Sequence, residues 1–231
     1  KKKHPDALLI AEESTAWPRV TGSVDTEDGL GFDYKWNMGW MNDFVGYMSN
    51  DPYFRGAHHN ELTFSMIYAY SERFMLSLSH DEVVHQKGSL LEKMPGTEDK
   101  KFANLRAAYG FFMTHPGKKL LFMGQEYGQV HEWAENKALD WENLEKPAHR
   151  QMQNYTKALI QLYKTHPALW KLDYDPDGFE WINCVEWEKS MVTFLRKSKK
   201  QEDTLVVICN FSDVALSLIH ISEPTRLGMI S

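Results

Sequence analysis

The sequence predicts an α/β fold with a parallel sheet, followed by a small antiparallel β region. Three apolar runs, at residues 6–13, 74–82 and 118–128, end in polar residues and alternate with helical segments, which is typical of buried parallel strands. From about Asp173 the chain changes to short strands separated by charged turns such as "EWEKS" and "KSKKQED". This second pattern indicates antiparallel pairing.

The first half of the chain alternates strands with loops and helices. The run "DALLIAEE" is short, apolar and bounded by polar residues, so we predict a buried strand there. Residues 25–40 are rich in Gly and aromatic side chains, which indicates a long loop with a short strand. We predict helices at 41–48 and 61–72, the second from its apolar period near 3.6, and a loop between them because Pro52 and Gly56 break regular structure.

The second half repeats this alternation more clearly. The strand "FMLSLSHDE" is followed by a helix at 99–115 that ends at Pro116-Gly117. The strand "KKLLFMGQEYG" and a long helix at 146–169 come next, and short strands lie at 179–190, 191–198 and 203–212. Because each strand of the α/β part is polar at its C-terminal end, we expect functional residues at that edge of the sheet, as in β/α barrels.

Composition excludes several functional classes. A net charge of −6 over 231 residues argues against a nucleic-acid partner, and no apolar run approaches the roughly 20 residues that span a membrane. The start "KKKHPDALLIAEEST" lacks the apolar segment of a signal peptide, and two cysteines make no disulfide framework, so we expect a reducing, cytoplasmic location. Eight Trp residues suit either core packing or stacking on sugars, and the sequence does not predict the oligomeric state.

The stretch "SHDEVVH" first suggests a metal site, but its spacing is wrong for one. The helical zinc motif needs two His four residues apart, whereas His80 and His85 are five apart. On a helix this spacing separates the side chains by roughly 140°, and on a strand it places them on opposite faces. We therefore expect no metal ion at this site.

Acid–base chemistry on carboxylates fits the same residues better. Glu12 and Glu13 end one predicted strand, and Asp81 and Glu82 end another. Carboxylates that converge at the C-terminal edge of a sheet suit glycosidic bond cleavage, which needs a protonated acid and an ionised carboxylate near the developing positive charge. The alternative is that these residues cap the helices that follow, which stays open for Glu13 and Glu82.

The quoted residues resemble a known family. "LLIAEESTAWP" and "FMLSLSHDEVVHQKGSL" are similar to the general-acid strand and the later His-Asp motif of 1,4-α-glucan (glycogen) branching enzymes, in the α-amylase superfamily of (β/α)8 barrels. Connecting blocks resemble the family as well, namely "GFDYKWNMGWMND", "HHNELTFSMIYAYSE", "KMPG" and "GKKLLFMGQEYGQ" followed by "EW". The resemblance covers roughly residues 5–213.

This resemblance implies a fold and a domain organisation. Residues 1–172 would be the second half of a (β/α)8 TIM barrel, strands 5–8, and residues 173–215 the start of an antiparallel β-sandwich domain. Residues 216–231 resemble the translation of a transposon-type sequencing adapter and are expected to be a non-native tail, although a genuine strand and tail is the alternative.

The resemblance also implies roles for individual residues. Glu12 matches the general acid/base, Asp81 the carboxylate that stabilises the transition state, and His80 a neighbour that hydrogen-bonds a sugar hydroxyl. Trp36 and Trp40 lie in the aromatic loop beside the donor glucan, with packing under the barrel rim as the alternative. Gln125 and Glu126, which end the last strand of the sheet, are expected to be architectural.

The reaction implied is transfer of an α-1,4-glucan segment to a 6-hydroxyl, forming an α-1,6 branch in glycogen by a retaining double displacement with no metal or organic cofactor. The family's nucleophilic Asp lies in a block like "GFRVDAV", which this sequence lacks. We therefore expect the chain to be a C-terminal fragment that is inactive alone. A hydrolase of the same superfamily, either an amylase or a debranching enzyme, and a non-catalytic glucan-binding fragment are the alternatives.

Overall fold

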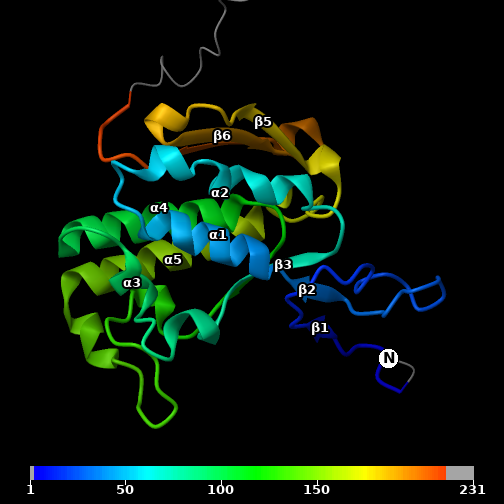
Figure 1. Ribbon diagram of the computed structural model, residues 1–231, viewed down its shortest axis with the longest axis horizontal. Helices are drawn as coiled ribbons and strands as arrows, with labels where there is room; N and C mark the ends of the chain where they lie inside the picture. The colour runs from blue at the N-terminus through cyan, green and yellow to red at the C-terminus, as the bar shows by residue number, and fades with distance from the viewer. Residues whose placement is uncertain (1–2, 217–231) are drawn as a thin grey trace, which may run out of the picture.

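The apolar runs form strands and the intervening segments form helices, as Figure 1 shows for the computed structural model, which describes residues 3–216. The helices are α1 (Met38–Ser49), α2 (Asn60–Thr63), α3 (Leu90–Lys93), α4 (Glu98–Thr114) and α5 (Pro147–Thr165). The strands are β1 (Ile10–Ala11), β2 (Tyr34–Trp36), β3 (Phe74–Leu78), β4 (Lys118–Leu121), β5 (Phe179–Asn183), β6 (Met191–Arg196) and β7 (Leu205–Asn210). Short 3-10 turns η3 (His80–Val83) and η4 (Gln125–Tyr127) follow β3 and β4.

The first four strands form one sheet in the order β1-β2-β3-β4, and every neighbouring pair is parallel. This confirms the parallel α/β part of the prediction. Parallel strands run in the same direction, so their C-terminal ends lie at one edge of the sheet. The residues that follow β1, β2 and β3 are therefore gathered at that edge.

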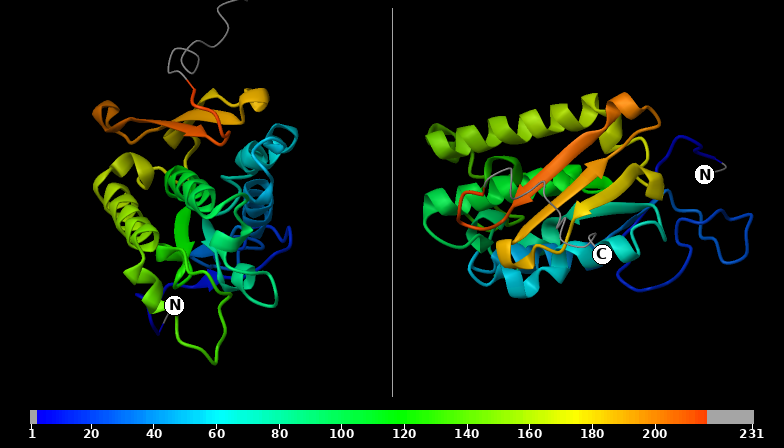
Figure 2. Two further views of the ribbon diagram at one scale, coloured as in Figure 1. Left: turned by 90° about the vertical axis from the view of Figure 1, so that its left-hand side faces the viewer. Right: turned by 90° about the horizontal axis from the view of Figure 1, so that it is seen from above.

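The last three strands form a second sheet in the order β5-β6-β7, with antiparallel pairing throughout. This confirms the change of pattern after Asp173. Val192 and Phe194 of β6 share one hydrophobic core with Phe111 and Phe112 of α4. Figure 2 shows the result, in which α1 and α4 lie between the two sheets, and α5 lies beside α4.

Helix α4 ends where the sequence predicts, at a Pro-Gly pair. His115 leaves the helical conformation. Gly117 has a backbone φ of 110°, a value that residues with a side chain rarely adopt. A Cβ at Gly117 would lie 3.1 Å from the carbonyl oxygen of Phe74. Only glycine therefore allows the chain to turn this close to β3 and pair with it as β4.

Two predicted elements are shorter than the sequence suggests. The strand at 6–13 is reduced to Ile10–Ala11, because β2 offers it a short partner with two residue pairs in register. The helix at 61–72 is replaced by α2 and a 3-10 turn at Phe64–Ile67. The apolar residues of this segment do not all pack on a neighbouring surface, since Ile67 is 79% exposed and Phe64 50% exposed. Most helices in proteins are stabilised by packing of an apolar face.

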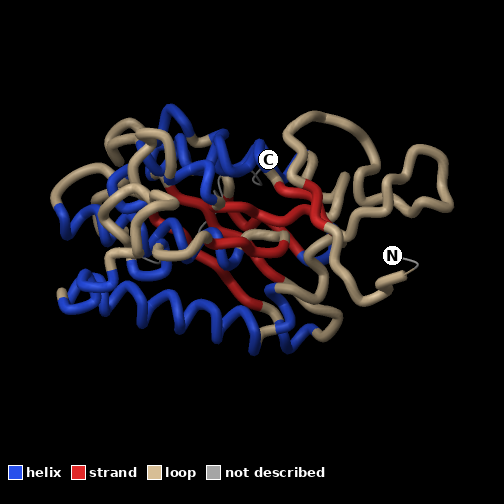
Figure 3. The backbone as a smooth tube through the Cα atoms, turned by 90° about the horizontal axis from the view of Figure 1, so that it is seen from below, coloured by secondary structure: helices blue, strands red, loops and turns tan. Residues whose placement is uncertain are grey.

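The connection between β1 and β2 projects from the body of the molecule, as Figures 1 and 3 show. Its base is held by Glu72, whose carboxylate accepts hydrogen bonds from the amides of Val20 and Thr21 at 2.7 and 2.8 Å. Of the suspected adapter-derived tail at 216–231, residues 217–231 lie outside the described part of the chain.

None of the helices in the described part of the chain is long and apolar enough to cross a bilayer. Within residues 3–216, no three His, Cys, Asp or Glu side chains are grouped so that they could hold a metal ion. Both cysteines are free thiols.

A buried ion pair joins the two sheets. Arg196 of β6 donates to Asp173 at 2.7 Å, and both side chains are fully buried. Lys118 of β4 reaches the same carboxylate at 2.9 Å. Burial alone would raise the pKa of Asp173, but Lys119, Arg196 and Lys118 outweigh it and hold that pKa below its ordinary value. The carboxylate is therefore ionised in the fold and bridges β4 and β6.

His115 makes the stability of the fold sensitive to pH. Burial, aided by the charge of Lys119, lowers the pKa of His115 to about 3. The ring is neutral, because its Nδ1 faces the carbonyl oxygen of Pro116 at 3.1 Å and must donate to it, which leaves Nε2 to accept from the Ser65 hydroxyl at 3.3 Å. In the unfolded chain His115 has the ordinary pKa of about 6.5, so below that pH it binds a proton there but not in the folded chain. This lowered pKa therefore removes stability as pH falls below about 6.5.

We expect the free energy of unfolding to decrease by about 2 kcal/mol through His115 between pH 7 and pH 5, at roughly 1.4 kcal/mol per pH unit below the unfolded pKa. Urea unfolding at the two pH values, for the natural chain and for His115→Gln, measures this contribution. The variant should lose about 2 kcal/mol less over the same interval, since carboxylate titration is common to both chains. Equal losses would show that the buried imidazole does not set the pH dependence.

Candidate active site

Three of the predicted site positions lie at one edge of the parallel sheet. Glu12 follows β1, Trp36 ends β2, and the pair His80-Asp81 follows β3. The register pairs Ala11 with Lys35 and Trp36 with Met75, so β1 and β2 end at nearly the same level while β3 continues three residues further, to Leu78. Adjacent strands are about 4.8 Å apart, so β1 and β3 run roughly 10 Å apart on either side of β2.

Glu12 and Glu13 have different surroundings although they are neighbours. Glu13 forms an ion pair with Lys35 at 2.6 Å, and accepts a hydrogen bond from the amide of Thr15 at 2.7 Å. These contacts, Lys35 first and then Thr15, lower the pKa of Glu13 to about 2. Glu12 is exposed and forms no ion pair with another residue of the range 3–216. Glu13 is thus held as a structural anion, while Glu12 is free to meet a substrate.

Lys35 is the residue that separates the two carboxylates, and the sequence reasoning did not single it out. Its side chain is 6% exposed, and its ammonium group also donates to the carbonyl oxygen of Thr15 at 2.9 Å. A buried ammonium needs such partners, because removing a charge from water is costly. Lys35 therefore fixes the first turn of the loop after β1. The sequence signal that could have indicated this role is a lysine between two aromatic residues in a short strand, Tyr34–Trp36.

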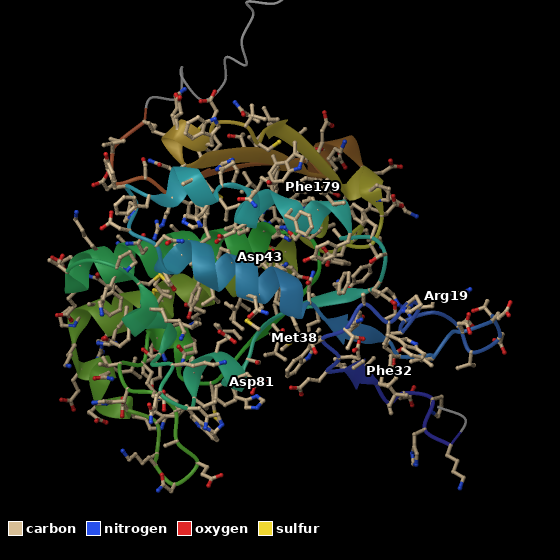
Figure 4. The ribbon with its side chains drawn as sticks, in the orientation of Figure 1. Arg19, Phe32, Met38, Asp43, Asp81 and Phe179 are labelled. Carbon is tan, nitrogen blue, oxygen red and sulfur yellow. The ribbon has the colours of Figure 1, made fainter. Side chains whose placement is uncertain are left out.

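His80 and Asp81 contact each other at the start of η3. The Nε2 atom of His80 lies 3.1 Å from Oδ1 of Asp81, and the side chains are 44% and 37% exposed. The ring of Phe122, which follows β4, packs against the His80 ring at 6.0 Å between centroids. Figure 4 shows Asp81 below Met38, where α1 begins. The structure brings these two residues together at the open edge, as the sequence predicts.

Glu82 and His85, which follow Asp81, differ in their surroundings. Glu82 is 8% exposed and pairs with Lys87 at 3.5 Å between Oε1 and Nζ. His85 is exposed and adopts a positive φ of 58°. Glu82 therefore faces the protein, and neither residue is placed beside Asp81 as a second catalytic group.

The two Trp residues occupy different environments. Trp36 is half-buried and lines a cavity of about 450 Å³ together with Glu13, Trp17, Lys35 and Tyr68. Trp40 is 1% exposed and stacks on Phe44 at 4.9 Å between ring centroids. A residue buried this deeply packs the core rather than touching a ligand, which supports the packing alternative for Trp40. Of the two Trp residues, only Trp36 lines this cavity.

Gln125 and its neighbours form the architectural end of the sheet. Gln125 is fully buried, and its side-chain oxygen accepts from the amide of Leu90 at 3.2 Å. The Tyr109 hydroxyl donates to the Gln125 carbonyl oxygen at 2.8 Å. These bonds join the turn after β4 to α3 and α4, which agrees with an architectural role for Gln125.

The chain was compared with known proteins, and no family model matches it. It is 54% identical over 209 residues to the 1,4-alpha-glucan branching enzyme GlgB of Geobacillus stearothermophilus, which covers 90% of this chain and 33% of that protein. The enzyme of the same name from Aquifex aeolicus (strain VF5) is 54% identical over 213 residues, covering 92% of this chain and 34% of that protein. By sequence, this chain is similar to one segment of the 1,4-alpha-glucan branching enzymes. It spans about a third of the length of the branching enzymes it matches.

Solved structures similar to this chain have the fold of α-amylase family enzymes. A pullulanase mutant from Paenibacillus barengoltzii complexed with maltotetraose has a TM-score of 0.67 at 19% identity, covering 98% of this chain and 39% of that chain. An α-amylase from H. orenii has a TM-score of 0.61 at 16% identity, covering 91% of this chain and 44% of that chain. At these identities the likeness shows the fold alone.

Proposed function

We propose that this chain supplies the general acid/base and a charge-stabilising carboxylate of a 1,4-α-glucan branching enzyme. One observation carries the proposal: in a chain 54% identical to such enzymes, Glu12 and Asp81 end two strands of one parallel sheet with a single strand between them. In this proposal residues 1–172 form strands 5–8 of a (β/α)8 barrel, and residues 173–215 begin a β-sandwich domain. The substrate is an α-1,4-glucan.

Each residue has a defined part in the proposed mechanism. Glu12 protonates the departing glycosidic oxygen and later removes the proton from the acceptor 6-hydroxyl. Asp81 stays ionised, and its charge stabilises the positive charge that develops at the anomeric carbon. His80, which contacts Asp81, donates a hydrogen bond to a sugar hydroxyl and helps to orient the ring. In the first step a nucleophilic carboxylate donates an electron pair to the anomeric carbon as the glycosidic bond breaks, so the reaction needs one carboxylate besides Glu12 and Asp81.

The nearest carboxylates in sequence do not meet that need, since Glu13 is paired with Lys35 and Glu82 with Lys87. We therefore expect the 231-residue chain alone to form no branches on amylose. The proposed activity is tested in a chimera in which residues 5–213 replace the matching third of the Geobacillus stearothermophilus enzyme.

We expect this chimera to form α-1,6 linkages on amylose, measured by NMR, with a fall in iodine staining and little release of reducing ends. A second chimera that carries the matching segment of the Aquifex aeolicus enzyme, also 54% identical to this chain, controls for the junctions. Branching by the control and none by the test chimera would contradict the proposal. Release of reducing ends without α-1,6 linkages would identify a hydrolase instead.

A further inference from the structure

The loop after β3 is held by the segment that follows β4. The amide of Phe122 donates to the Leu78 carbonyl oxygen at 2.9 Å, and the amide of Trp133 donates to the Val83 carbonyl oxygen at 3.0 Å. Within the same segment, the Glu132 carboxylate accepts from the amide of Gly88 at 2.9 Å. These bonds surround η3, the short turn that carries His80 and Asp81.

The backbone at 85–88 adopts a conformation that needs an outside partner. His85, Gln86 and Gly88 have φ values of 58°, 68° and 71°, and two of the three are not glycine. L residues avoid this left-handed region because Cβ approaches the following carbonyl oxygen. Such a turn persists only where its surroundings compensate for the strain. Successive amides in this kind of turn point into one concavity, which favours an anion.

Glu132 supplies that anion. The amide of Gly88 donates to Glu132, and this bond, with further contributions from the amides of Gln86 and Lys87, lowers the pKa of Glu132 below its ordinary value. The carboxylate therefore accepts from the turn through Gly88, which lies 44 residues away in sequence. A glutamine at this position would present an amide N–H group to donors that need an acceptor. The substitution Glu132→Gln would therefore remove the charge and one of the two acceptor oxygens at nearly constant size.

The residue next to Glu132 connects this contact to the candidate site. The Trp133 ring packs edge-on against Phe122 at 5.4 Å between centroids, and Phe122 packs against His80 at 6.0 Å. The turn at 85–88 and the ring of His80 are thus held by one short segment, residues 122–133. A shift of Glu132 away from the turn would loosen both supports of η3.

We propose that Glu132 is a positioning residue that holds the turn at 85–88 and, through it, the orientation of His80 and Asp81. The proposal rests on the proposed function for its catalytic consequence, but not for the contact itself. In this proposal Glu132 does not contact the substrate. Its effect is exerted on the rate of the chemical step, because a small misplacement of a positioned group costs much of its transition-state stabilisation.

The contact is tested by amide hydrogen exchange in the 231-residue chain, with Glu132→Gln, Glu132→Asp and the control Glu135→Gln. Glu135 lies in the same loop and is exposed, so its substitution changes the charge equally without removing this contact. We expect Glu132→Gln to raise exchange at Gln86, Lys87 and Gly88 about tenfold or more, and to raise it through η3 as well. Glu132→Asp should restore part of the protection. Exchange equal to that of Glu135→Gln, or confined to 86–88, would overturn the proposal.

The catalytic consequence is tested by the same substitutions in the Geobacillus chimera. We expect Glu132→Gln to lower kcat for branching about 10- to 100-fold with KM changed less than threefold, and Glu132→Asp to recover much of kcat. Values for Glu132→Gln that match Glu135→Gln would overturn the positioning role. A chimera that is inactive before any substitution contradicts the proposed function instead, and amide exchange then decides whether Glu132 holds η3.

Discussion

Replacing Glu12 with Gln in the chimera is expected to lower branching turnover by about 10²- to 10⁴-fold, the usual contribution of a general acid/base. Gln has the shape of Glu but has no proton to give to the departing glycosidic oxygen. The exposed position of Glu12 after β1 means that the substitution removes no ion pair within residues 3–216, so the unfolding temperature should stay within a few degrees. Initial rates on amylose, with thermal unfolding measured in parallel, check both expectations.

A donor whose leaving group needs no proton distinguishes lost acid catalysis from lost structure. The first step on an α-maltosyl fluoride should be nearly unaffected by Glu12→Gln, because fluoride departs without protonation. Glu13→Gln is the matched comparison, since it alters the next residue and removes the Lys35 ion pair instead. If Glu12→Gln lowered branching turnover only a few-fold and Glu13→Gln lowered it more, Glu12 would not be the general acid.

Replacing Arg196 with Met is expected to lower the free energy of unfolding of the chain by about 3–5 kcal/mol, the range found when one partner of a buried ion pair is removed. The guanidinium group donates to Asp173 and to the carbonyl oxygens of Thr114 and Leu169, at 2.7, 2.6 and 3.2 Å. Methionine fills much of the volume but removes this donor from the two carbonyl oxygens and leaves the buried Asp173 carboxylate with Lys118 as its ion-pair partner. Urea unfolding at pH 7 measures the loss.

The residue next to Arg196 provides the control. Lys197 pairs with Glu180 at 2.8 Å, but the two side chains are 31% and 57% exposed. Surface ion pairs contribute about 0–1 kcal/mol, because water screens them and ordering the side chains costs entropy. Lys197→Met should therefore change stability little. Similar losses for the two substitutions would mean that the buried pair does not join the sheets.

Much of the fold follows from local pattern. The helix that becomes α4 ends at Pro116-Gly117 as predicted, because proline and glycine act on the backbone wherever they stand. The strand that becomes β3 was predicted because its apolar run is bounded by polar residues. The prediction of one continuous helix at 61–72 was wrong. Phe64 and Ile67 are exposed and do not pack on a neighbouring surface, and the segment forms α2 and a 3-10 turn instead. A periodic pattern does not reveal whether a partner surface exists.

The candidate site was predicted in part. Glu12, His80 and Asp81 were singled out by their position after strands and by resemblance, and the parallel sheet gathers them at one edge. Trp40 belongs to the core, because α1 turns its side chain toward Phe44. Lys35 and Glu132 were not assigned roles, since their partners Glu13 and Gly88 lie 22 and 44 residues away and become neighbours only in the fold.

The sequence by itself determined the kind of elements, their order and the residue types at the strand ends, because these depend on interactions within a few residues. The tertiary structure alone decided which carboxylates are free and which are bound. In "AEES" and "SHDE" the sequence does not show which of two adjacent acidic residues is paired. In the structure Glu13 pairs with Lys35 and Glu82 with Lys87. Charge pairing acts through space over a few ångströms, so a carboxylate's role depends on neighbours that only the folded chain brings to it.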